Sequence, residues 1–299
     1  AGGGVLGSQI AYQAAYKGFA VTVWLRSEGS VERAKPKFEQ LRQTYLATLE
    51  AMKSDPAAYC RGLADTPELS VDEIEQLKQA FESIVFTTSY EAAAKDADLV
   101  IEAIAEDPKQ KDAFYAELAK YLPESTILVT NSSTLLPSQI AASTGRPEKF
   151  LALHFANRIW RNTAEVMGHP GTDQAAYDEV VRFAADLGMV PLQLHKEQPG
   201  YILNSMLVPF LNAAEALYAT GVADPETIDK TWMLGTGAPL GPFRILDIVG
   251  LTTAYNIVVL DPRTKDPDSV PAKIAAALKE RIDAGKTGVD AGEGFYRYN

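Results

Sequence analysis

The sequence contains one cysteine and three histidines among its 299 residues. Because a disulfide needs two thiols, the lone Cys60 argues against an intrachain disulfide and against a cysteine-based zinc site. We see no acid-base partner for Cys60 in the nearby sequence, so we interpret it as a structural thiol rather than a reactive one. A reducing compartment fits this cysteine usage, and we expect a cytoplasmic protein.

Excess positive charge and long apolar runs are also absent from the sequence. Lysine and arginine number 28 against 39 acids, and the resulting net charge of −11 disfavours a polyanionic partner such as nucleic acid. We find no apolar run of the roughly 18 residues that span a bilayer and no signal-peptide pattern at the start. We therefore expect neither a nucleic-acid partner nor a membrane partner.

Short apolar segments that alternate with helical patterns dominate the first two thirds of the chain. Such strands are typical of parallel sheets that are covered on both faces, so we predict a Rossmann-type, doubly wound and mostly parallel α/β sheet. A charged helical pattern at about 31–81 predicts a helical hairpin inserted between strands. The strands are predicted at 20–25, 84–87, 99–103, 127–130, 151–155, 163–167 and 190–194.

The alternation stops after His195, and a long apolar helical segment follows at 200–219. A length of 299 residues favours two domains, since domains commonly contain about 150 residues. We therefore predict a dinucleotide-binding domain at 1–195 and an all-helical domain at 196–299. The apolar character of the second domain predicts a homodimer that forms through it.

A glycine motif opens the chain. Gly2, Gly4 and Gly7 form the pattern G-x-G-x-x-G directly before a predicted helix and strand. In dinucleotide-binding folds these glycines form a tight turn, let the backbone approach a pyrophosphate and let the helix pack on the sheet. The motif normally follows a buried strand, so we expect that residues upstream of Ala1 are missing from the sequence.

The end of the second strand normally decides which nicotinamide cofactor is bound. A carboxylate at this place binds the ribose hydroxyl of NAD and repels the 2′-phosphate of NADP. Arg26 and Ser27 occupy the place here, and both side chains suit a phosphate, so we favour NADP. NAD remains possible, because a small shift of the loop brings Glu28 to the same place.

Polar side chains gather where the later strands of the predicted sheet end. His154 ends one apolar strand, and Asn131, Ser132 and Ser133 follow another. An imidazole can remove the hydroxyl proton as hydride leaves a secondary alcohol, and small polar residues can bind the reacting oxygen. The next strand can bring Glu165 beside the imidazole to fix its tautomer. These residues predict a dehydrogenase site.

Six segments in order along the chain resemble the signatures of the 3-hydroxyacyl-CoA dehydrogenase family. They are LVIEAIAED at 99–107, NSSTL at 131–135, LHFAN at 153–157, PGYILNSMLVP at 199–209, LGTGAPLGPFRILDIVG at 234–250 and GEGFYRY at 292–298. The resemblance covers nearly the whole chain. It implies a Rossmann-type domain, a helical dimerising domain and an acyl-CoA thioester as substrate.

The resemblance also implies a role for individual residues. His154 matches the catalytic base and Glu165 its partner, while Ser133 and Asn204 match the groups that bind the reacting oxygen. Residues that match positions near the cofactor are Glu106, Lys111, Asn157 and Lys286, in addition to Ser133 itself.

The chain departs from the family at several of these segments. Arg158 replaces the proline that follows the asparagine of the histidine segment, and Ser205 replaces an arginine after Asn204. Leu41 and Thr48 stand where the family uses a serine and a lysine to bind coenzyme A. Three basic residues of the same helix are the remaining candidates for the nucleotide phosphates, although charged helix faces are usually solvated: Lys35, Lys37 and Arg42.

Two alternative functions stay open at this point. A dehydrogenase of a free 3-hydroxy acid, such as a sugar acid, uses the same base in a related branch. A non-catalytic nucleotide-binding protein can also retain this fold, since a fold alone does not establish activity.

Overall fold

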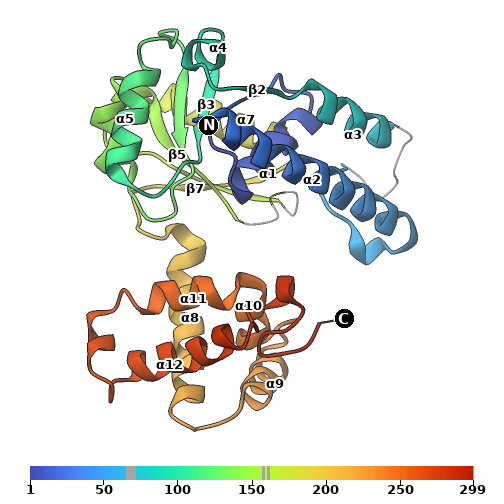
Figure 1. Cartoon of the computed structure of the whole chain (residues 1–299), viewed down its shortest axis with the longest axis vertical. Coiled ribbons are helices and arrows are strands. Elements are labelled where there is room, and N and C mark those ends of the chain that lie inside the picture. Colours follow the sequence, from blue (N-terminus) through green and yellow to red (C-terminus); the bar gives the residue numbers. More distant parts are fainter. Residues whose placement is uncertain (65–71, 157–158, 160–161, 299) are drawn as a thin grey trace. The chain divides into compact units, whose positions relative to one another are not determined.

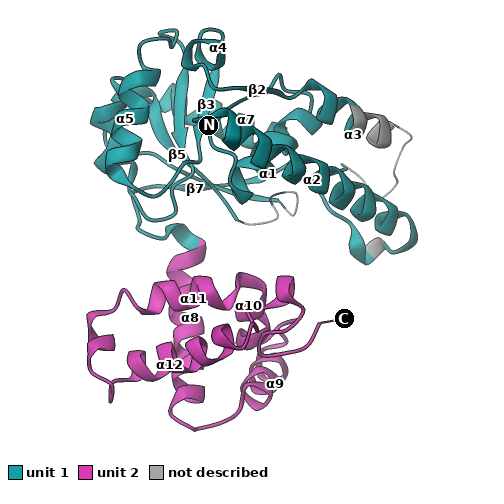
Figure 2. Cartoon of the chain, viewed as in Figure 1, with its two compact units in different colours: residues 1–202 teal, residues 203–299 magenta. Residues whose placement is uncertain are grey.

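The computed structural model describes residues 1–64, 72–156, 159 and 162–298, and it divides into two compact units (Figures 1 and 2). Unit 1 comprises residues 1–202 and unit 2 comprises residues 203–299. The division falls after Ile202 rather than after His195, where the sequence analysis places it. The cause is the segment after the last strand, since Tyr201 is buried against the histidine of that sheet and so belongs to unit 1.

Unit 1 alternates strands and helices in the order that the sequence predicts. Its strands are β1 (Thr22–Trp24), β2 (Val85–Thr87), β3 (Leu99–Glu102), β4 (Ile127–Thr130), β5 (Phe150–Phe155), β6 (Thr163–Met167) and β7 (Val190–Leu194). Its helices are α1 (Val5–Tyr16), α2 (Glu28–Ser54), α3 (Asp72–Ser83), α4 (Tyr90–Ala94), α5 (Pro108–Leu118), α6 (Pro137–Ile140) and α7 (Gln174–Asp186).

The strands form two sheets in the described part of unit 1 (Figure 1). One sheet has the order β3-β4-β5-β6-β7, and the other pairs β1 with β2. All neighbours run parallel except β5 and β6, which pair antiparallel with His154 opposite Glu165. The predicted fold class, a Rossmann-like and mostly parallel sheet, is confirmed.

The larger sheet is buried on both faces, which explains its nearly continuous apolar strands. Val129 and Leu151 point to a cluster that includes Val180 of α7. Their neighbours Leu128 and Phe150 point to the opposite cluster, with Phe114 and Leu118 of α5. Successive side chains of a strand face opposite sides, so a strand between two helical layers is apolar at most positions, and a polar side chain in it needs a buried partner.

The predicted helical hairpin is present as α2 and α3, which pack on α1. Its core contains the buried residues Phe38, Leu41 and Tyr45 of α2 and Leu77 of α3. Helix α2 begins after Ser27, whose hydroxyl accepts a hydrogen bond from the amide of Ser30. This cap starts the helix at Glu28, earlier than the apolar periodicity indicates.

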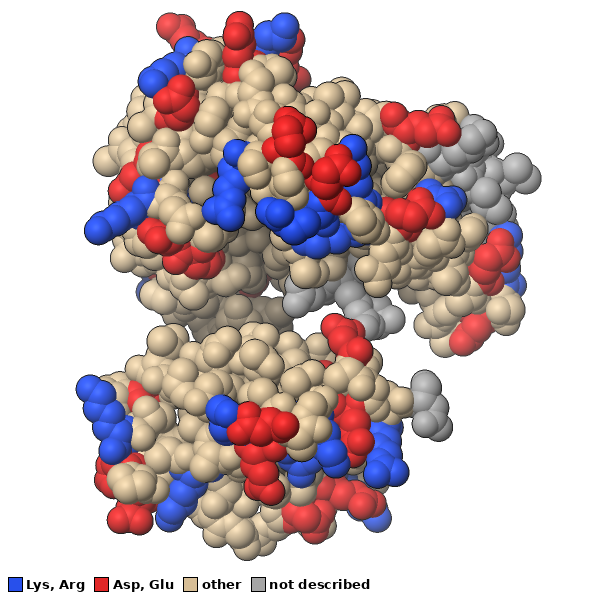
Figure 3. Space-filling model, viewed as in Figure 1, with Lys and Arg blue, Asp and Glu red and all other residues tan. Residues whose placement is uncertain are grey.

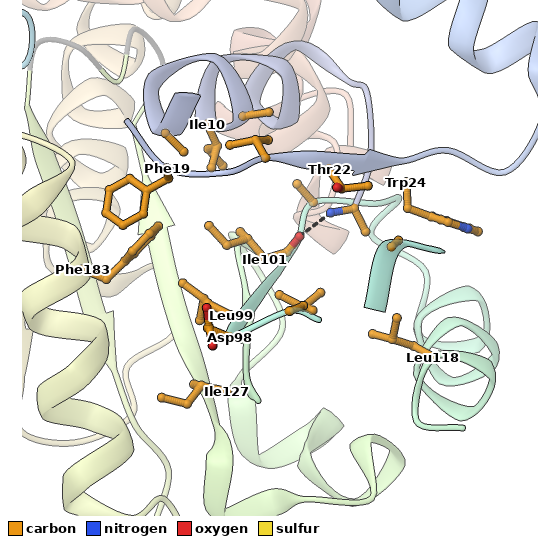
Figure 4. Close-up of a pocket in the computed structure, with 18 of the residues that line it drawn as sticks. Ile10, Phe19, Thr22, Trp24, Asp98, Leu99, Ile101, Leu118, Ile127 and Phe183 are labelled. Carbon is orange, nitrogen blue, oxygen red and sulfur yellow. Dashed lines mark hydrogen bonds between the residues drawn. The ribbon is translucent and has the colours of Figure 1, made fainter. Parts of the chain in front are cut away.

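A cavity of about 900 Å³ lies between β1 and β3, at the junction of the two sheets (Figure 4). Its lining is mostly apolar, and it includes Ile10, Leu99 and Phe183. The nitrogen of Ala1 donates to the carbonyl of Ile101 at 2.6 Å, and the amide of Gly2 donates to Trp24 at 3.1 Å. The edges of both sheets therefore face this cavity.

Unit 2 is helical throughout its described residues, apart from connecting segments and two isolated bridges near the C-terminus. Its core contains Phe243, Leu246, Leu251 and Leu278, all nearly fully buried. The helices are α8 (Tyr201–Ala219), which starts in unit 1, α9 (Pro225–Thr236), α10 (Pro242–Val249), α11 (Leu251–Val258) and α12 (Val270–Asp283).

Helix α8 is long and apolar enough to cross a membrane, by length and composition alone. The expectation that no run reaches this length is therefore wrong for α8. Core helices of soluble proteins pass the same test, and α8 carries Asn204, Pro209 and Glu215. A carboxylate is expensive inside a bilayer, so the composition of α8 gives little support to a membrane span.

Charged side chains of both signs are interspersed over the surface that Figure 3 displays. Many of the pairs join residues one helical turn apart, such as Lys35 with Glu32 and Lys53 with Glu50. The face shown therefore carries charges of both signs, several of them paired within one helix.

Candidate active site

The glycine turn leads into α1 with space at its second glycine. A Cβ on Gly2 would lie 2.3 Å from the carbonyl oxygen of Ala103, and a Cβ on Gly7 would lie 2.5 Å from that of Gly2. A Cβ on Gly4 would meet no described atom within 4 Å. Gly2 and Gly7 are therefore required for packing. The open side at Gly4, at the start of a helix, fits the pyrophosphate of a dinucleotide.

The residues after β1 leave a cation exposed. Arg26 is exposed, and the hydroxyl of Ser27 lies 3.0 Å from that of Ser30 at the start of α2. Glu28, the competing acid, accepts a hydrogen bond from the hydroxyl of Thr88 at 3.1 Å. In this arrangement Glu28 is engaged by the loop after β2, while the guanidinium of Arg26 is accessible to a phosphate.

His154 and Glu165 form a buried pair at the centre of the larger sheet. His154 Nδ1 lies 3.1 Å from Glu165 Oε2, and both residues are about 5% exposed or less. They are direct partners in the antiparallel ladder of β5 and β6, so both side chains point to the same face. The other carboxylate oxygen, Oε1, accepts the amide of Ile202 at 2.9 Å. Glu165 thus fixes the proton of a neutral imidazole on Nδ1 and leaves Nε2 as a base.

Ser133 lies on the other side of the imidazole. Its hydroxyl is 3.2 Å from His154 Nε2, and its amide donates to Glu106 Oε1 at 2.8 Å. The second oxygen of Glu106 accepts the hydroxyl of Ser132 at 2.8 Å. Glu106 therefore holds the turn that presents Ser133, a role that the sequence analysis does not assign to it.

The sequence also suggests Asn131 and Ser132 as residues that bind a substrate oxygen. In the structure, their side chains make hydrogen bonds within the protein instead. The amide oxygen of Asn131 accepts the main-chain amide of Phe155 at 3.1 Å. Both side chains are nearly buried, whereas Ser133 is partly exposed. Of these three residues, Ser133 is the one placed beside the base.

Lys111 is buried below this turn. Its ammonium lies 2.6 Å from Glu102 Oε1 and 3.7 Å from Glu106, and its side chain is 1% exposed. Glu102 also accepts hydrogen bonds from Tyr115 and Thr130. Burial raises the pKa of Tyr115 well above its usual value, and the nearby carboxylate adds to this, so its hydroxyl remains a donor. The network supports Glu106 from beneath and keeps the lysine away from the surface.

The structure does not place three of the predicted site residues relative to this pair. Asn157, like Arg158, lies outside the described residues. Asn204 and Lys286 belong to unit 2, where the ammonium of Lys286 pairs with Glu293 at 2.8 Å. Their predicted roles as oxygen-binding and cofactor-binding residues stay predictions.

Sequence reasoning missed two buried residues of the site, Glu102 and Tyr201. Glu102 ends an otherwise apolar strand, and a carboxylate in such a place signals a buried partner. Tyr201 lies with its ring centroid 4.2 Å from that of His154, after a turn at Gly200. In the sequence, the one sign of this contact is a glycine directly before an aromatic residue.

The basic residues of α2 are engaged by the protein. Lys35 pairs with Glu32, Arg42 makes two hydrogen bonds to Glu39, and Lys37 donates to the carbonyl of Gly3 at 2.8 Å. The hydroxyl of Thr48 donates to its own helix, and Leu41 is buried in the hairpin core. The two positions that the resemblance matches to coenzyme A binding thus carry side chains that are used within the protein.

Comparison with known families decides the assignment. The model of the 3-hydroxyacyl-CoA dehydrogenase NAD-binding domain matches residues 1–198, and the model of the C-terminal domain of the same family matches residues 200–298. The chain belongs to the 3-hydroxyacyl-CoA dehydrogenase family. The predicted resemblance is confirmed, and a nicotinamide dinucleotide is the cofactor that the matching NAD-binding domain supports.

Relatives from this family extend over nearly the whole chain. The mitochondrial hydroxyacyl-coenzyme A dehydrogenase of Rattus norvegicus is 32% identical over 99% of this chain and 89% of its own length. A solved (S)-3-hydroxybutyryl-CoA dehydrogenase from Ralstonia eutropha has a TM-score of 0.76 at 26% identity, and covers 100% of this chain and 97% of its own.

A third relative is named for a different substrate. A solved diketoreductase, described as catalysing reactions of dicarbonyl compounds, is 48% identical with a TM-score of 0.87. The match covers 99% of this chain and 96% of that one. Within the family, therefore, this chain is similar both to thioester dehydrogenases and to an enzyme named for dicarbonyl compounds.

Proposed function

We propose that the protein is a 3-hydroxyacyl-CoA dehydrogenase that transfers hydride between a nicotinamide cofactor and the 3-position of a 3-hydroxyacyl or 3-oxoacyl thioester. The single observation that carries this proposal is the chain of contacts from Ser133 through His154 to Glu165. A base held on both nitrogens beside a small hydroxyl is what oxidation of a secondary alcohol requires. Membership of the family supports the same function.

The reaction follows from the two sides of the imidazole. In the oxidising direction His154 Nε2 accepts the proton of the substrate 3-hydroxyl, while Ser133 donates a hydrogen bond to the substrate oxygen. Glu165 then stabilises the imidazolium through Nδ1. The bound nicotinamide supplies the hydride acceptor, or the hydride donor in reduction. When the reaction runs towards the alcohol, His154 returns the proton to the same oxygen.

We propose NADP(H) as the preferred form of the cofactor. The exposed guanidinium of Arg26 and the hydroxyl of Ser27 support it, because both suit a 2′-phosphate. The hydrogen bond that Glu28 accepts from Thr88 also supports it, since it occupies one oxygen of the competing acid. A preference for NAD(H) in the native enzyme would contradict this choice.

Michaelis constants test the cofactor assignment. We expect Arg26→Gln to raise the KM for NADPH by about tenfold, the loss of one charge-assisted contact of roughly 1.4 kcal/mol. The KM for NADH should change by less than about twofold, because NADH lacks the 2′-phosphate. Arg61, an exposed arginine in the described part of unit 1, provides a matched control as Arg61→Gln.

Reduction of a free dicarbonyl compound or 3-oxo acid is the second candidate function. Two observations favour it: the 48% identity to the diketoreductase, and the engagement of the basic side chains of α2 by the protein itself. A dehydrogenase of a free 3-hydroxy acid such as a sugar acid uses the same base and belongs to this candidate.

One assay separates these candidates. The absorbance of the reduced nicotinamide is followed with each cofactor against acetoacetyl-CoA, its free acid and a non-thioester dicarbonyl compound. We expect kcat/KM to be highest for the thioester. A free compound that is turned over at least tenfold better establishes the second candidate, and cofactor binding without turnover of any compound supports a non-catalytic nucleotide-binding protein.

We further propose a cytoplasmic homodimer. Exposed apolar side chains in unit 2, including Met206, Leu234 and Leu260, supply an apolar surface that a second copy can cover. The buried and single Cys60 is compatible with a reducing compartment. Light scattering tests the assembly, and a mass equal to one chain at micromolar concentration would contradict the dimer.

A further inference from the structure

The face of the catalytic imidazole is covered by an aromatic ring. The rings of His154 and Tyr201 are stacked, with centroids 4.2 Å apart and planes 11° from parallel. Tyr201 is 1% exposed and His154 is 5% exposed. The stack therefore excludes water from this face, and the imidazole cannot turn about its Cβ–Cγ bond without displacing the tyrosine ring.

The hydroxyl of Tyr201 ties the same ring to the turn that carries Ser133. It donates to the carbonyl of Ser132 at 2.7 Å, and the hydroxyl of Ser132 donates to Glu106. Burial raises the pKa of Tyr201 well above its usual value, so the phenol stays protonated and remains a donor. The side chain of Tyr201 thus contacts two parts of the site. Its ring lies on the face of the His154 imidazole, and its hydroxyl binds the backbone of the turn that carries Ser133.

The backbone around Tyr201 is shaped for this contact. Gly200 and Tyr201 have φ values of 78° and 55°, and a non-glycine residue in the left-handed region is strained. The amide of the next residue, Ile202, donates to Glu165 Oε1 at 2.9 Å. The same short turn therefore reaches the base, the carboxylate that orients it and the turn that carries the serine.

We propose that Tyr201 is a positioning residue of the dehydrogenase, which holds His154 in one ring orientation and fixes the turn of Ser133 against it. This inference rests on the proposed function for its kinetic part. Glu165 and Ser133 contact the two nitrogens of the imidazole, and Tyr201 supplies the contact that these two cannot, at the face of the ring. Its hydroxyl sets the distance from the base to Ser133 through the backbone of Ser132.

A role in packing alone gives different expectations. Loss of a buried ring that merely fills space lowers the free energy of unfolding, but leaves the turnover of each folded molecule unchanged. Loss of a positioning residue lowers kcat with little change in KM, because the base and the oxygen-binding serine are misplaced in the transition state. The tautomer of His154 is a further difference, since packing alone does not set it.

Two substitutions separate the ring from its hydroxyl. We expect Tyr201→Leu, which removes the stack, to lower kcat by about tenfold to a hundredfold with less than about a threefold change in KM. We expect Tyr201→Phe, which retains the ring but lacks the hydroxyl, to lower kcat by about twofold to tenfold. A kcat for Tyr201→Phe that lies between those of the parent and Tyr201→Leu separates the contribution of the stacked ring from that of the hydrogen bond to Ser132.

The nitrogen NMR signals of His154 give a readout that needs no turnover. The chain has three histidines, so the imidazole spectrum is simple, and His154→Ala assigns the signal. In the parent protein we expect one neutral tautomer with the proton on Nδ1. We expect averaged nitrogen shifts from two ring orientations in Tyr201→Leu, and parent-like shifts in Tyr201→Phe.

Tyr45→Phe is the matched control, because Tyr45 is also fully buried and its hydroxyl donates to Gln13 at 2.6 Å within the hairpin core. We expect it to lower stability while kcat and the His154 signals stay unchanged. Parent-like kcat and His154 signals in Tyr201→Leu would overturn the proposal. If Tyr201→Leu does not fold, Tyr201→Phe decides, and parent values of both kcat and KM in it would overturn the role of the hydroxyl.

Failure of the proposed function and failure of the positioning role of Tyr201 give different experimental results. A parent protein that turns over none of the substrates removes the proposed function, yet the tautomer of His154 still tests whether Tyr201 positions the ring. Conversely, normal turnover in Tyr201→Leu refutes the positioning role and leaves the dehydrogenase intact.

Discussion

Buried carboxylates occur in both units of the protein, but they have different partners. In unit 1, Glu165 contacts His154, whose other nitrogen faces a partly exposed serine. In unit 2, Asp247 accepts the amides of Phe295 and Tyr296 and the hydroxyl of Tyr298. A carboxylate beside a titratable group supports chemistry, whereas one surrounded by main-chain donors supports the fold.

Replacing the base gives the largest effect that this comparison predicts. We expect His154→Ala to lower kcat by about two to four powers of ten, the usual contribution of a general base. The free energy of unfolding should fall as well, because the change leaves a cavity beside Tyr201 and removes the partner of Glu165 Oε2, so kcat is referred to the folded fraction. The measurement is kcat with the preferred substrate, alongside urea unfolding. Near-normal turnover in a folded variant would mean that another group is the base.

Removing the carboxylate of Asp247 in unit 2 should mainly lower the free energy of unfolding and have little effect on kcat. Asp247 is 1% exposed, and Asp247→Ala leaves several buried donors without an acceptor, so we expect a loss of about 3 kcal/mol or more in stability. Circular dichroism during urea unfolding measures it. Asp290→Ala, at an exposed aspartate, is the control and should unfold like the parent. A parent-like transition in Asp247→Ala would show that the amides find other acceptors.

Glu215 extends the comparison of buried carboxylates, because it lacks a hydrogen-bond partner for one of its oxygens among the described residues. It is 3% exposed, and its Oε1 has no hydrogen-bond partner among the described residues. Burial raises the pKa of Glu215 from 4.5 to about 7. The folded protein therefore holds this proton more tightly than the unfolded chain does. The resulting stability is complete below about pH 4.5 and is lost as the pH rises through about 7.

The corresponding experiment is a series of urea transitions at different pH values. We expect the parent to lose up to about 3 kcal/mol from this group between pH 5 and pH 8, and Glu215→Gln to lack that part of the dependence. The transition that Asp247→Ala shifts is the one to follow, since both residues belong to unit 2. If the free energy of unfolding depends on pH in the same way in the parent and in Glu215→Gln, a group other than Glu215 is titrating.

The smallest effect is expected at an exposed ion pair. Lys35 and Glu32 lie 2.9 Å apart with side chains 53% and 69% exposed. We expect Lys35→Ala to move the thermal midpoint by no more than about 1–2 °C, because solvent screens such pairs. The KM for acetoacetyl-CoA should also stay unchanged. A clear rise in that KM would revive Lys35 as a contact for nucleotide phosphates.

The strands and the hairpin followed from the sequence because their patterns are local. A strand covered on both faces is mostly apolar, as in 127–130 and 163–167, and both ranges match the structure. The helix at 28–54 was predicted with a late start, since its cap at Ser27 depends on one hydroxyl rather than on periodicity. The domain boundary was placed at His195 because the burial of Tyr201 leaves no local pattern.

The candidate site was predictable in part for a similar reason. His154 lies near the carboxyl end of β5 and Ser133 follows β4, where parallel sheets gather their polar groups. Glu165 lies in the middle of β6, and only the pairing of the strands places it opposite His154. Glu106 was expected near a cofactor, but its contacts with Ser132 and Ser133 join residues 26 and 27 positions apart. Lys111 was expected beside the cofactor as well, and its burial against Glu102 depends on how α5 packs on β3.

By itself, the sequence determined the order of strands and helices and the glycine turn, and it pointed to His154 as the candidate base, since each depends on neighbouring residues. The tertiary structure alone decided that β6 runs antiparallel to β5 with Glu165 opposite His154, and that the ring of Tyr201 covers the imidazole. Strand direction, register and stacking arise from packing between distant segments, and short-range patterns do not encode such contacts.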